Sequence, residues 1–128
     1  MDLKLVKNKR IYWDFIRELR SDDRVQDGFI QKVKITKEQQ ASYMEKHNDD
    51  YWICLCDGYP AGFVGNIDGD IRVAVHPMFQ RKGVGKFMIN ELMKKNNGHA
   101  KIKIDNEASL ALFRSCGFKD KYIILEKE

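Results

Sequence analysis

The sequence contains little of what marks secreted, membrane-spanning or nucleic-acid-binding chains. It has only 3 cysteines and 2 prolines among 128 residues, and no apolar run approaches the ~18 residues that a membrane span requires. The stretch from Met1 to Arg10 carries no apolar core of a secretory signal, and basic residues do not gather into a tail. We therefore expect a cytoplasmic protein in a reducing compartment, with neither a nucleic-acid nor a membrane partner.

Two of the cysteines, Cys54 and Cys56, lie two residues apart in an apolar run. This spacing is one half of a zinc-ligand pattern, but a second half with ligand spacing is missing because His47, His76 and His99 are scattered. We expect no metal site. The two thiols should instead be small buried side chains on one face of a strand.

The overall composition is that of an ordinary globular chain. Hydrophobic residues make up 43% and charged residues 33%, and the net charge is +4. Length and composition predict a single domain over residues 1–128. The mild positive charge is compatible with a partner that carries phosphate.

Hydrophobic periodicity changes several times along the chain and predicts an alternation of elements. The expected order is strand, two helices, a three-strand meander, helix, strand, helix and strand, with a mixed sheet covered by helices in an α/β (α+β) fold. The stretch 25–33, interrupted at Gly28, is ambiguous. The predicted strands cover 3–6, 51–56, 61–67, 70–75, 100–104 and 118–126, and the helices cover 11–19, 36–47, the stretch after 83–85, and 108–116.

Three local signals support this order. Thr36 followed by Gln39 is a capping box that opens a helix. Asp57-Gly58 and Asp68-Gly69 each separate two apolar runs and predict hairpin turns.

The loop from Gln80 to Gly85 is the most informative segment, because it joins a strand to a helix and carries two glycines. Backbone amides in such a loop and at the helix start form a site suited to phosphate. A Walker A loop would need glycine at Gln80 and Ser or Thr at Phe87, and a dinucleotide fingerprint would need glycine at Met88. Of the phosphate-binding patterns considered, only Gln-x-x-Gly-x-Gly fits this loop. A plain glycine-rich turn is the other interpretation.

A second segment, Asn106 to Phe118, follows the next predicted strand and ends in Gly-Phe. Together, the two segments resemble the GNAT superfamily of acyl-CoA N-acyltransferases. The resemblance covers Tyr51 to Phe118 well and the rest of the chain by topology. It implies that acetyl-CoA lies in the splay between the fourth and fifth strands, 70–75 and 100–104.

The resemblance also implies which residues contact the acetyl donor. Val73 and Val75 would contribute backbone groups, with the Val73 N–H polarising the thioester carbonyl. Asn106 would bind pantetheine and Phe113 would pack beside it. The remaining cofactor contacts would come from Gln80, Arg81, Lys82, Gly83, Val84, Gly85, Lys86 and Ser109.

The catalytic base is expected to be a carboxylate near the start of the third meander strand, because relatives often place one there. Asp70 and Asp68 flank the matching position, although a hairpin turn also explains both. Asp105, just past a predicted strand end, is a third candidate. Many relatives carry a tyrosine where this chain has Phe113, so the acid that would protonate the thiolate is missing at that place.

The acceptor amine is expected to meet arginines. Arginines recur at three- and four-residue spacing at Arg17, Arg20 and Arg24. On the predicted strand 70–75, the side chain of Arg72 should point to the opposite face from that of Val73. Arg17, Arg20 and Arg72 are the predicted acceptor contacts, with a solvated charged face as the other interpretation. The N-terminal stretch weakly resembles relatives that acetylate amino sugars carried on nucleotides, where arginines would meet phosphates.

The sequence thus predicts an acetyl-CoA-dependent N-acetyltransferase that acts on a primary amine of a small molecule. Two other functions stay open: acetylation of protein N-termini or lysines, and a catalytically inactive acyl-CoA-binding regulatory module. The chain after Gly117-Phe118 is shorter than in relatives, so the acceptor site is either open there or closed by a second subunit. A monomer and a homodimer are both compatible with this.

Overall fold

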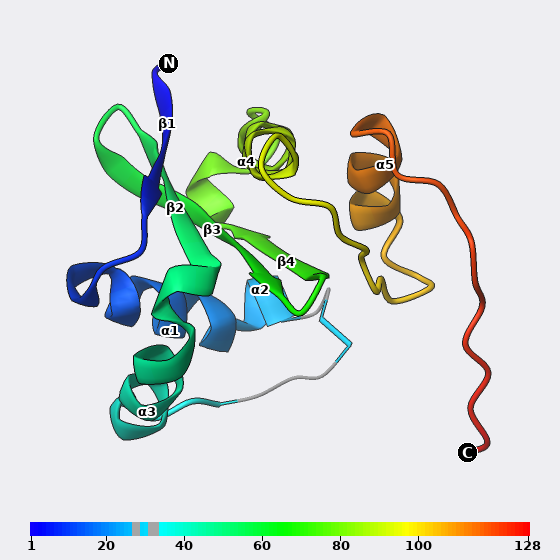
Figure 1. The fold of residues 1–128 in the computed structure, drawn as a ribbon, viewed down its shortest axis with the longest axis horizontal. Coiled ribbons are helices and arrows are strands. Elements are labelled where there is room, and N and C mark those ends of the chain that lie inside the picture. The colour runs from blue at the N-terminus through cyan, green and yellow to red at the C-terminus, as the bar shows by residue number, and fades with distance from the viewer. Residues whose placement is uncertain (27–28, 31–33) are drawn as a thin grey trace.

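Four antiparallel strands form the sheet in the order β1-β2-β3-β4 (Figure 1). The computed structural model describes residues 1–26, 29–30 and 34–128. The strands are β1 (Leu3–Lys7), β2 (Tyr51–Cys56), β3 (Tyr59–Ile67) and β4 (Asp70–Val75). The meander is therefore confirmed.

Both predicted hairpin turns are present. Asp57 and Gly58 have φ values of 50° and 85°, and Asp68 and Gly69 have 53° and 89°. Two successive residues at positive φ are the signature of the type I′ turn, whose twist matches that of the flanking strands. The Asp-Gly pairs fit this turn because aspartate tolerates the left-handed region and glycine has no Cβ to oppose it.

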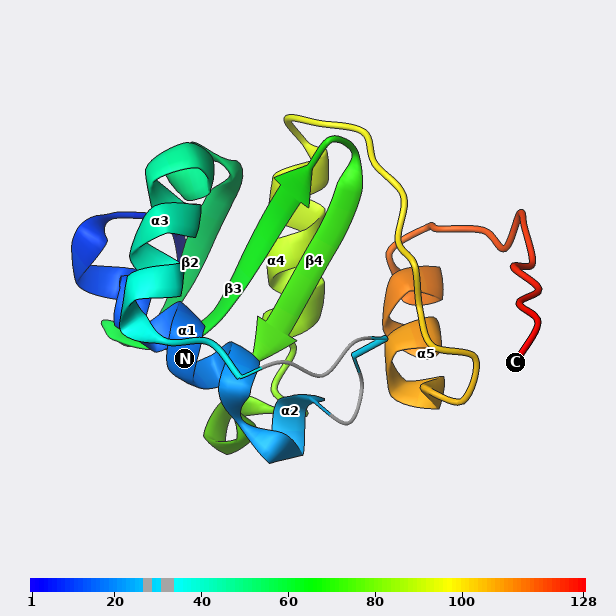
Figure 2. The same cartoon turned by 90° about the horizontal axis from the view of Figure 1, so that it is seen from below.

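Helices cover both faces of the sheet (Figure 2). α1 (Trp13–Ser21) and α3 (Lys37–His47) lie on one face, and α4 (Val84–Met93) lies on the other with α5 (Glu107–Ser115) beside it. A short helix, α2 (Asp23–Gln26), follows α1. Single 3₁₀ turns cover Arg10–Tyr12, Asn48–Asp50 and Pro77–Phe79.

The capping box at the start of α3 is confirmed. The Gln39 N–H donates to Thr36 Oγ1 at 3.1 Å, and the Thr36 N–H donates to Gln39 Oε1 at 2.9 Å. Two backbone donors that the helix would otherwise leave unpaired are thus satisfied by side chains.

Alternation along the strands builds a separate core on each face. Cys54, Val64 and Ile71 pack with α4, and the alternate side chains, among them Tyr51 and Phe63, pack with α1 and α3. Cys54 and Cys56 are both buried on the α4 side. The expectation that these two thiols act as small apolar side chains on one face is confirmed.

Two predicted strands are wrong. In segment 100–104, parallel pairing with β4 stops at a single bridge between Asp70 and His99. Ala100 and Ile102 then pack against the α4-side core, with no further pairing to β4 in the described chain. Segment 118–126 contains no strand either, because after Phe118 it runs along no strand of the described chain and its side chains are exposed.

The fold class is nevertheless confirmed, as an α/β arrangement whose sheet is antiparallel where described. Of the ambiguous stretch 25–33, residues 27–28 and 31–33 lie outside the described residues. Within the described part of the chain, no helix is long and apolar enough to cross a membrane.

Candidate active site

A cleft of about 940 Å³ opens between β4 and segment 100–102. Loop 79–86 lies at one end of it, and Asn106, Ser109 and Phe113 from the region of α5 line one side. This is the splay that the sequence places there, although its second wall is an irregular segment and not a strand.

The backbone of β4 directs amides into the cleft. The Ile71 N–H donates outward to the His99 carbonyl, and the His76 N–H donates inward to Ala61 of β3, each at 2.8 Å. Because backbone groups alternate in direction along a strand, the N–H groups of Val73 and Val75 point outward like that of Ile71. Both valines line the cleft, so the two predicted backbone donors face the predicted space.

Loop 80–85 has two residues with left-handed backbone before the start of α4. Arg81 and Gly83 have φ values of 63° and 80°, and the first backbone bond of α4 runs from the Phe87 N–H to the Gly83 carbonyl at 3.0 Å. The amides of Val84, Gly85 and Lys86 precede that bond and lie at the positive end of the helix dipole. All three residues line the cleft.

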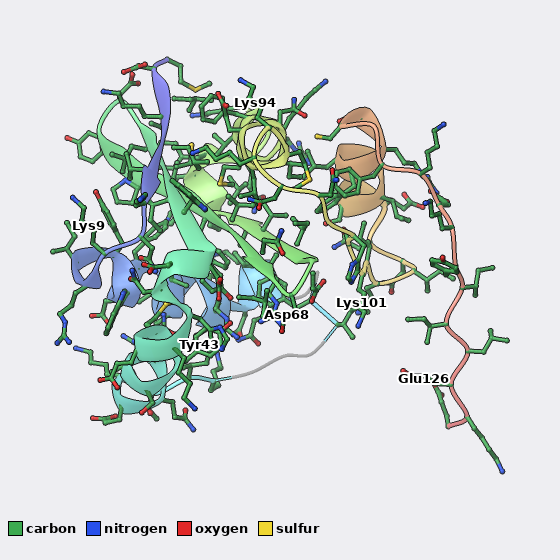
Figure 3. All side chains as sticks on the ribbon, viewed as in Figure 1. Lys9, Tyr43, Asp68, Lys94, Lys101 and Glu126 are labelled. Carbon is green, nitrogen blue, oxygen red and sulfur yellow. The ribbon has the colours of Figure 1, made fainter. Side chains whose placement is uncertain are left out.

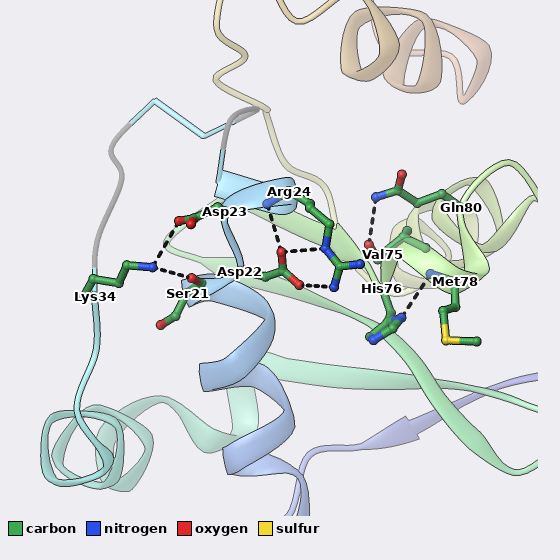
Figure 4. A network of polar contacts seen from close by, with 9 residues as sticks. All are labelled: Ser21, Asp22, Asp23, Arg24, Lys34, Val75, His76, Met78 and Gln80. Atoms are coloured by element: carbon green, nitrogen blue, oxygen red, sulfur yellow. Dashed lines mark hydrogen bonds and ion pairs between the residues drawn. The ribbon is translucent and has the colours of Figure 1, made fainter.

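Side chains around this loop take different positions. Gln80 Nε2 donates to the Val75 carbonyl at 3.2 Å, which ties the loop to the end of β4 (Figure 4). Arg81 and Lys86 line the cleft. Lys82, also predicted as a cofactor contact, is not among the lining residues, and its ammonium lies 5.8 Å from the centre of the Phe79 ring.

The start of α5 presents the residues that the second motif predicts. Asn106 Oδ1 accepts a bond from the Ser109 N–H at 3.1 Å and caps the helix. Phe113 is buried, with its ring centre 5.1 Å from that of Phe118 in an edge-on arrangement. Phe113 supplies apolar surface and no proton, so α5 offers no acid at that place.

The three candidate carboxylates are separated by the structure. Asp70 lines the cleft, and its Oδ2 lies 3.5 Å from Arg72 Nε. Asp68 is in the hairpin turn and does not line the cleft (Figure 3). Asp105 is likewise outside the lining, and its carboxylate lies 3.9 Å from Lys103 Nζ.

Three arginines outside loop 79–86 line the cleft among the described residues. Arg20 and Arg72 do so as expected, and Arg24 does so near Val75 and Gln80, at the end of β4 (Figure 4). Arg17 does not; its guanidinium pairs instead with Asp14 at 3.0 Å. Of the predicted acceptor contacts, two are brought together and one is held elsewhere on α1.

Two tyrosines hold Arg72. Arg72 Nη1 donates to the Tyr43 hydroxyl at 3.2 Å, which lies 2.8 Å from the Tyr51 hydroxyl. Burial raises the pKa of Tyr51 well above its usual range, so the phenol stays neutral at physiological pH. The Arg20 guanidinium lies over the Tyr43 ring at 5.3 Å.

Arg24 is fixed by Asp22 (Figure 4). Its Nη2 and Nε donate to the two carboxylate oxygens at 2.7 and 3.0 Å, and its backbone N–H donates to Oδ1 at 2.9 Å. These bonds lower the pKa of Asp22 to about 2. Nearby, Lys34 Nζ donates to the Ser21 carbonyl at 3.0 Å and to Asp23 at 3.1 Å.

Sequence reasoning missed Tyr51 and Lys101 as residues of the cleft. A signal for Tyr51 was present in Gly65, because a Cβ added there would lie 2.6 Å from the Tyr51 ring, and a strand glycine often marks such a close approach. Lys101 belongs to the segment predicted as a strand, whose true path the sequence pattern does not show.

Comparison with known proteins gives a family match. The model of the acetyltransferase (GNAT) family matches residues 10–118. N-alpha-acetyltransferase RimI of Mycobacterium tuberculosis is 36% identical over 50 residues, which is 37% of this chain and 32% of that protein. The matched stretch therefore spans about a third of that relative's length.

Solved structures share the fold. Spermidine N-acetyltransferase from Vibrio cholerae, in complex with CoA and spermine, has a TM-score of 0.84 at 17% identity, over 98% of this chain and 85% of that one. AAC(6′)-Iy, in complex with the bisubstrate analogue CoA-S-monomethyl-acetylneamine, has a TM-score of 0.71 at 14% identity, over 100% and 99%. At these identities the likeness shows the fold alone.

Proposed function

Because the chain belongs to the acetyltransferase (GNAT) family, a class of acetyl-CoA-dependent N-acetyltransferases, we propose that it acetylates the primary amine of a small, negatively charged molecule. An amino sugar that carries phosphate is such a molecule. The observation that carries this proposal is the charge of the cleft. Among the residues that the structure describes, its lining contains six cationic side chains and one carboxylate: Arg20, Arg24, Arg72, Arg81, Lys86, Lys101 and Asp70.

The donor end accounts for part of that charge. The amides of Val84 to Lys86, with the cationic side chains of Arg81 and Lys86, suit a pyrophosphate group. Val73 and Val75 offer outward amides along the edge of β4. The Val73 N–H would donate to the thioester carbonyl oxygen as negative charge develops on it, a contribution typically worth ~3 kcal/mol.

The proton of the acceptor ammonium must leave before attack, because such a group has a pKa near ~10. Asp70 is the candidate base that lines the cleft, and it would act directly or through one water. The guanidinium of its neighbour Arg72 lies 3.5 Å from the Asp70 carboxylate. Beyond this step, catalysis by direct attack depends mostly on holding the amine ~3–3.5 Å from the carbonyl carbon.

Two arginines outside loop 79–86, Arg20 and Arg72, support an anionic acceptor. Guanidinium groups bind phosphate or carboxylate with paired hydrogen bonds. A polyamine would instead meet like charge at most of the charged side chains of the described lining, where Asp70 is the compensating carboxylate. This is a difference in chemistry from the spermine-bound neighbour, whose fold the chain shares.

A panel assay tests the proposal. Release of CoA is followed with amino-sugar nucleotides, polyamines, aminoglycosides and N-terminal peptides, while acetyl-CoA binding is measured separately by calorimetry. We expect turnover with a phosphate-bearing amine and little with polyamines. Turnover confined to polyamines would reject the anionic acceptor, and failure to bind acetyl-CoA would reject the donor site.

Acetylation of a protein N-terminus is a second candidate, favoured by the similarity to RimI over 50 residues. A catalytically inactive acyl-CoA-binding module is a third, favoured by the absence of a hydroxyl at Phe113. The same panel separates them. Peptides would be the sole acceptors for the second, and acetyl-CoA would bind without turnover of any amine for the third.

A further inference from the structure

Arg24 lines the cleft from α2 and lies near Val75 and Gln80, where β4 passes into loop 80–85 (Figure 4). The Gln80 side chain donates to the Val75 carbonyl at 3.2 Å and so holds the loop at this place. Other residues of the loop line the same cleft. Arg24 therefore shares one end of the cleft with a loop that belongs to the other half of the chain.

Asp22 occupies one edge of the Arg24 guanidinium. Arg24 Nε and Nη2 donate to the two carboxylate oxygens at 3.0 and 2.7 Å, whereas Nη1 has no hydrogen-bond partner among the described residues. A guanidinium carries its N–H donors in a planar fork. The edge formed by Nη1 and Nη2 is therefore available for two parallel bonds to an anion. Figure 4 shows Val75 on the opposite side of this guanidinium from Asp22.

The pair presents its cation to the cleft and keeps its carboxylate behind. The Arg24 side chain is 66% exposed and that of Asp22 is 20% exposed. Arg24 lines the cleft, and Asp22 is not among its described lining residues. Asp22 Oδ1 also accepts from the Arg24 backbone N–H at 2.9 Å, so its oxygens are engaged by Arg24. An anion in the cleft would therefore meet the guanidinium and not the carboxylate.

The backbone that carries Arg24 is anchored as well. Val25 and Gln26, which follow it in α2, are both buried. Gln26 Nε2 donates to the Arg20 carbonyl at 2.8 Å, which ties α2 to the end of α1. Because the side chain and its helix are both held in place, the guanidinium has little conformational freedom to lose when it binds an anion.

We propose that Arg24 binds the pyrophosphate of the acetyl donor, together with the amides at the start of α4. This inference rests on the proposed function, which places the donor phosphates at those amides. A pyrophosphate carries negative charge on both of its phosphates, and the free edge of Arg24 would bind oxygens that the amides leave unpaired. The donor would then be held from both halves of the chain, and a thioester without phosphate would lose this contact.

Donor analogues that differ in their phosphates test the proposal on the full-length chain. Calorimetry gives the Kd of acetyl-CoA, of its 3′-dephospho form and, at millimolar concentration, of S-acetylpantetheine, which has no phosphate. Arg24→Gln should raise the Kd of both pyrophosphate-bearing thioesters about tenfold, because it removes hydrogen bonds between charged groups. The Kd of S-acetylpantetheine should change less than about twofold on the same reasoning. Equal losses for all three thioesters, or a loss confined to acetyl-CoA, would overturn the pyrophosphate contact.

Arg114→Gln is the matched control, because Arg114 also donates two bonds to one carboxylate, that of Asp120, at 2.6 and 3.0 Å. Arg114 is not among the described lining residues of the cleft, so this variant should bind all three thioesters like wild type. Both variants should keep the circular dichroism spectrum of the wild-type chain.

The outcomes separate this inference from the function on which it rests. A wild-type chain that binds none of the thioesters would reject the donor site and this inference together. Wild-type binding of acetyl-CoA with an unchanged Kd for Arg24→Gln would reject the inference alone. A higher KM for the acceptor, with an unchanged Kd for acetyl-CoA, would assign the anion at Arg24 to the acceptor and likewise overturn the inference.

Discussion

The hydroxyl of Tyr43 lies 2.8 Å from that of Tyr51. Tyr43 comes from α3 and Tyr51 from β2, so this contact joins a helix to the sheet beneath it. Tyr43 also accepts the bond from Arg72 Nη1 at 3.2 Å. The pair therefore fixes the position of a cationic group that lines the cleft and that we propose as an acceptor contact.

Replacing Tyr43 by phenylalanine should weaken acceptor binding and leave donor binding intact. The change removes the hydroxyl that accepts from Arg72, a hydrogen bond to a charged group that is worth about 1.5 kcal/mol or more. We expect roughly a tenfold rise in KM for the acceptor, with the Kd for acetyl-CoA within twofold of wild type. Steady-state kinetics and calorimetry measure the two quantities.

The control for Tyr43→Phe is Tyr59→Phe, because Tyr59 is 70% exposed at the start of β3. Tyr59→Phe should change neither the KM for the acceptor nor the Kd for acetyl-CoA. Equal rises in both constants for Tyr43→Phe would show a general loss of fold instead of a loss of Arg72 positioning.

Glutamate at Gly83 should abolish acetyl-CoA binding without unfolding the chain. Gly83 has φ 80°, and a Cβ built there meets nothing within 4 Å, so the cost to folding is the left-handed backbone of about 1–2 kcal/mol. The carboxylate would stand at the amides of α4 that we assign to the donor phosphates. We expect the Kd by calorimetry to rise at least a hundredfold.

Gly58→Glu is a matched control for that change. Gly58 has φ 85° and equally open surroundings, but it lies in the β2–β3 turn. Both variants should lose similar stability on heating, and only Gly83→Glu should lose acetyl-CoA. If both bound the donor like wild type, the assignment of loop 80–85 would be wrong.

Arg24→Gln should return the pKa of Asp22 from about 2 toward its ordinary value of 3.8, since the bonds from Arg24 are the cause of the shift. A carboxylate with a lowered folded-state pKa stabilises the fold above pH 3.8, and this contribution disappears as pH falls toward 2. The Asp22 carboxyl signal, followed by NMR titration, checks the midpoint. Arg17→Gln, which removes the partner of Asp14, should leave the Asp22 midpoint unchanged.

Much of the fold could be predicted because its signals are local. Each type I′ turn depends on two adjacent residues, Asp and Gly. The cap of α3 depends on Thr36 and Gln39, which lie within one turn of the same helix. The donor end of the cleft follows in the same way, because its amides belong to one continuous strand, loop and helix start. Such features need no knowledge of distant parts of the chain.

Two strands were predicted wrongly because a strand needs a neighbouring strand to pair with. Hydrophobic periodicity does not show whether such a neighbour is present. Segment 100–104 alternates lysine and isoleucine, but its pairing with β4 ends at His99 because the cleft separates the two. Tyr122 to Leu125 has the composition of a strand, but no strand of the described chain pairs with it. Lys101 and Tyr51 enter the cleft through packing between segments far apart in sequence.

Burial makes Cys54 unreactive at physiological pH. Removal from water, with a smaller contribution from Cys56, raises the pKa of the Cys54 thiol to about 11. The protonated form, which is a poor nucleophile, therefore predominates until pH approaches 11. At pH 8, iodoacetamide should label the partly exposed Cys116 and leave Cys54 unlabelled, as read by mass spectrometry of peptides. Full labelling of Cys54 in the folded protein would contradict its place in the core.

The last prediction separates the two aspartates that flank Gly69. Asp70 lines the cleft, whereas Asp68 occupies the first left-handed position of the turn. Asp70→Asn removes the proposed base and should lower kcat/KM by about 10²–10⁴-fold, with acetyl-CoA binding unchanged. Asp68→Asn should retain activity near that of wild type, because asparagine suits the same turn position.

The pH dependence distinguishes loss of a base from loss of structure. Without Asp70, only the small neutral fraction of the acceptor amine reacts, and that fraction rises tenfold per pH unit below the amine pKa near ~10. The log of kcat/KM for Asp70→Asn should therefore climb with a slope near one between pH 7 and 9, and the wild-type slope should be shallower. Parallel profiles for the two proteins would assign Asp70 to holding Arg72, at 3.5 Å, and leave proton removal to water.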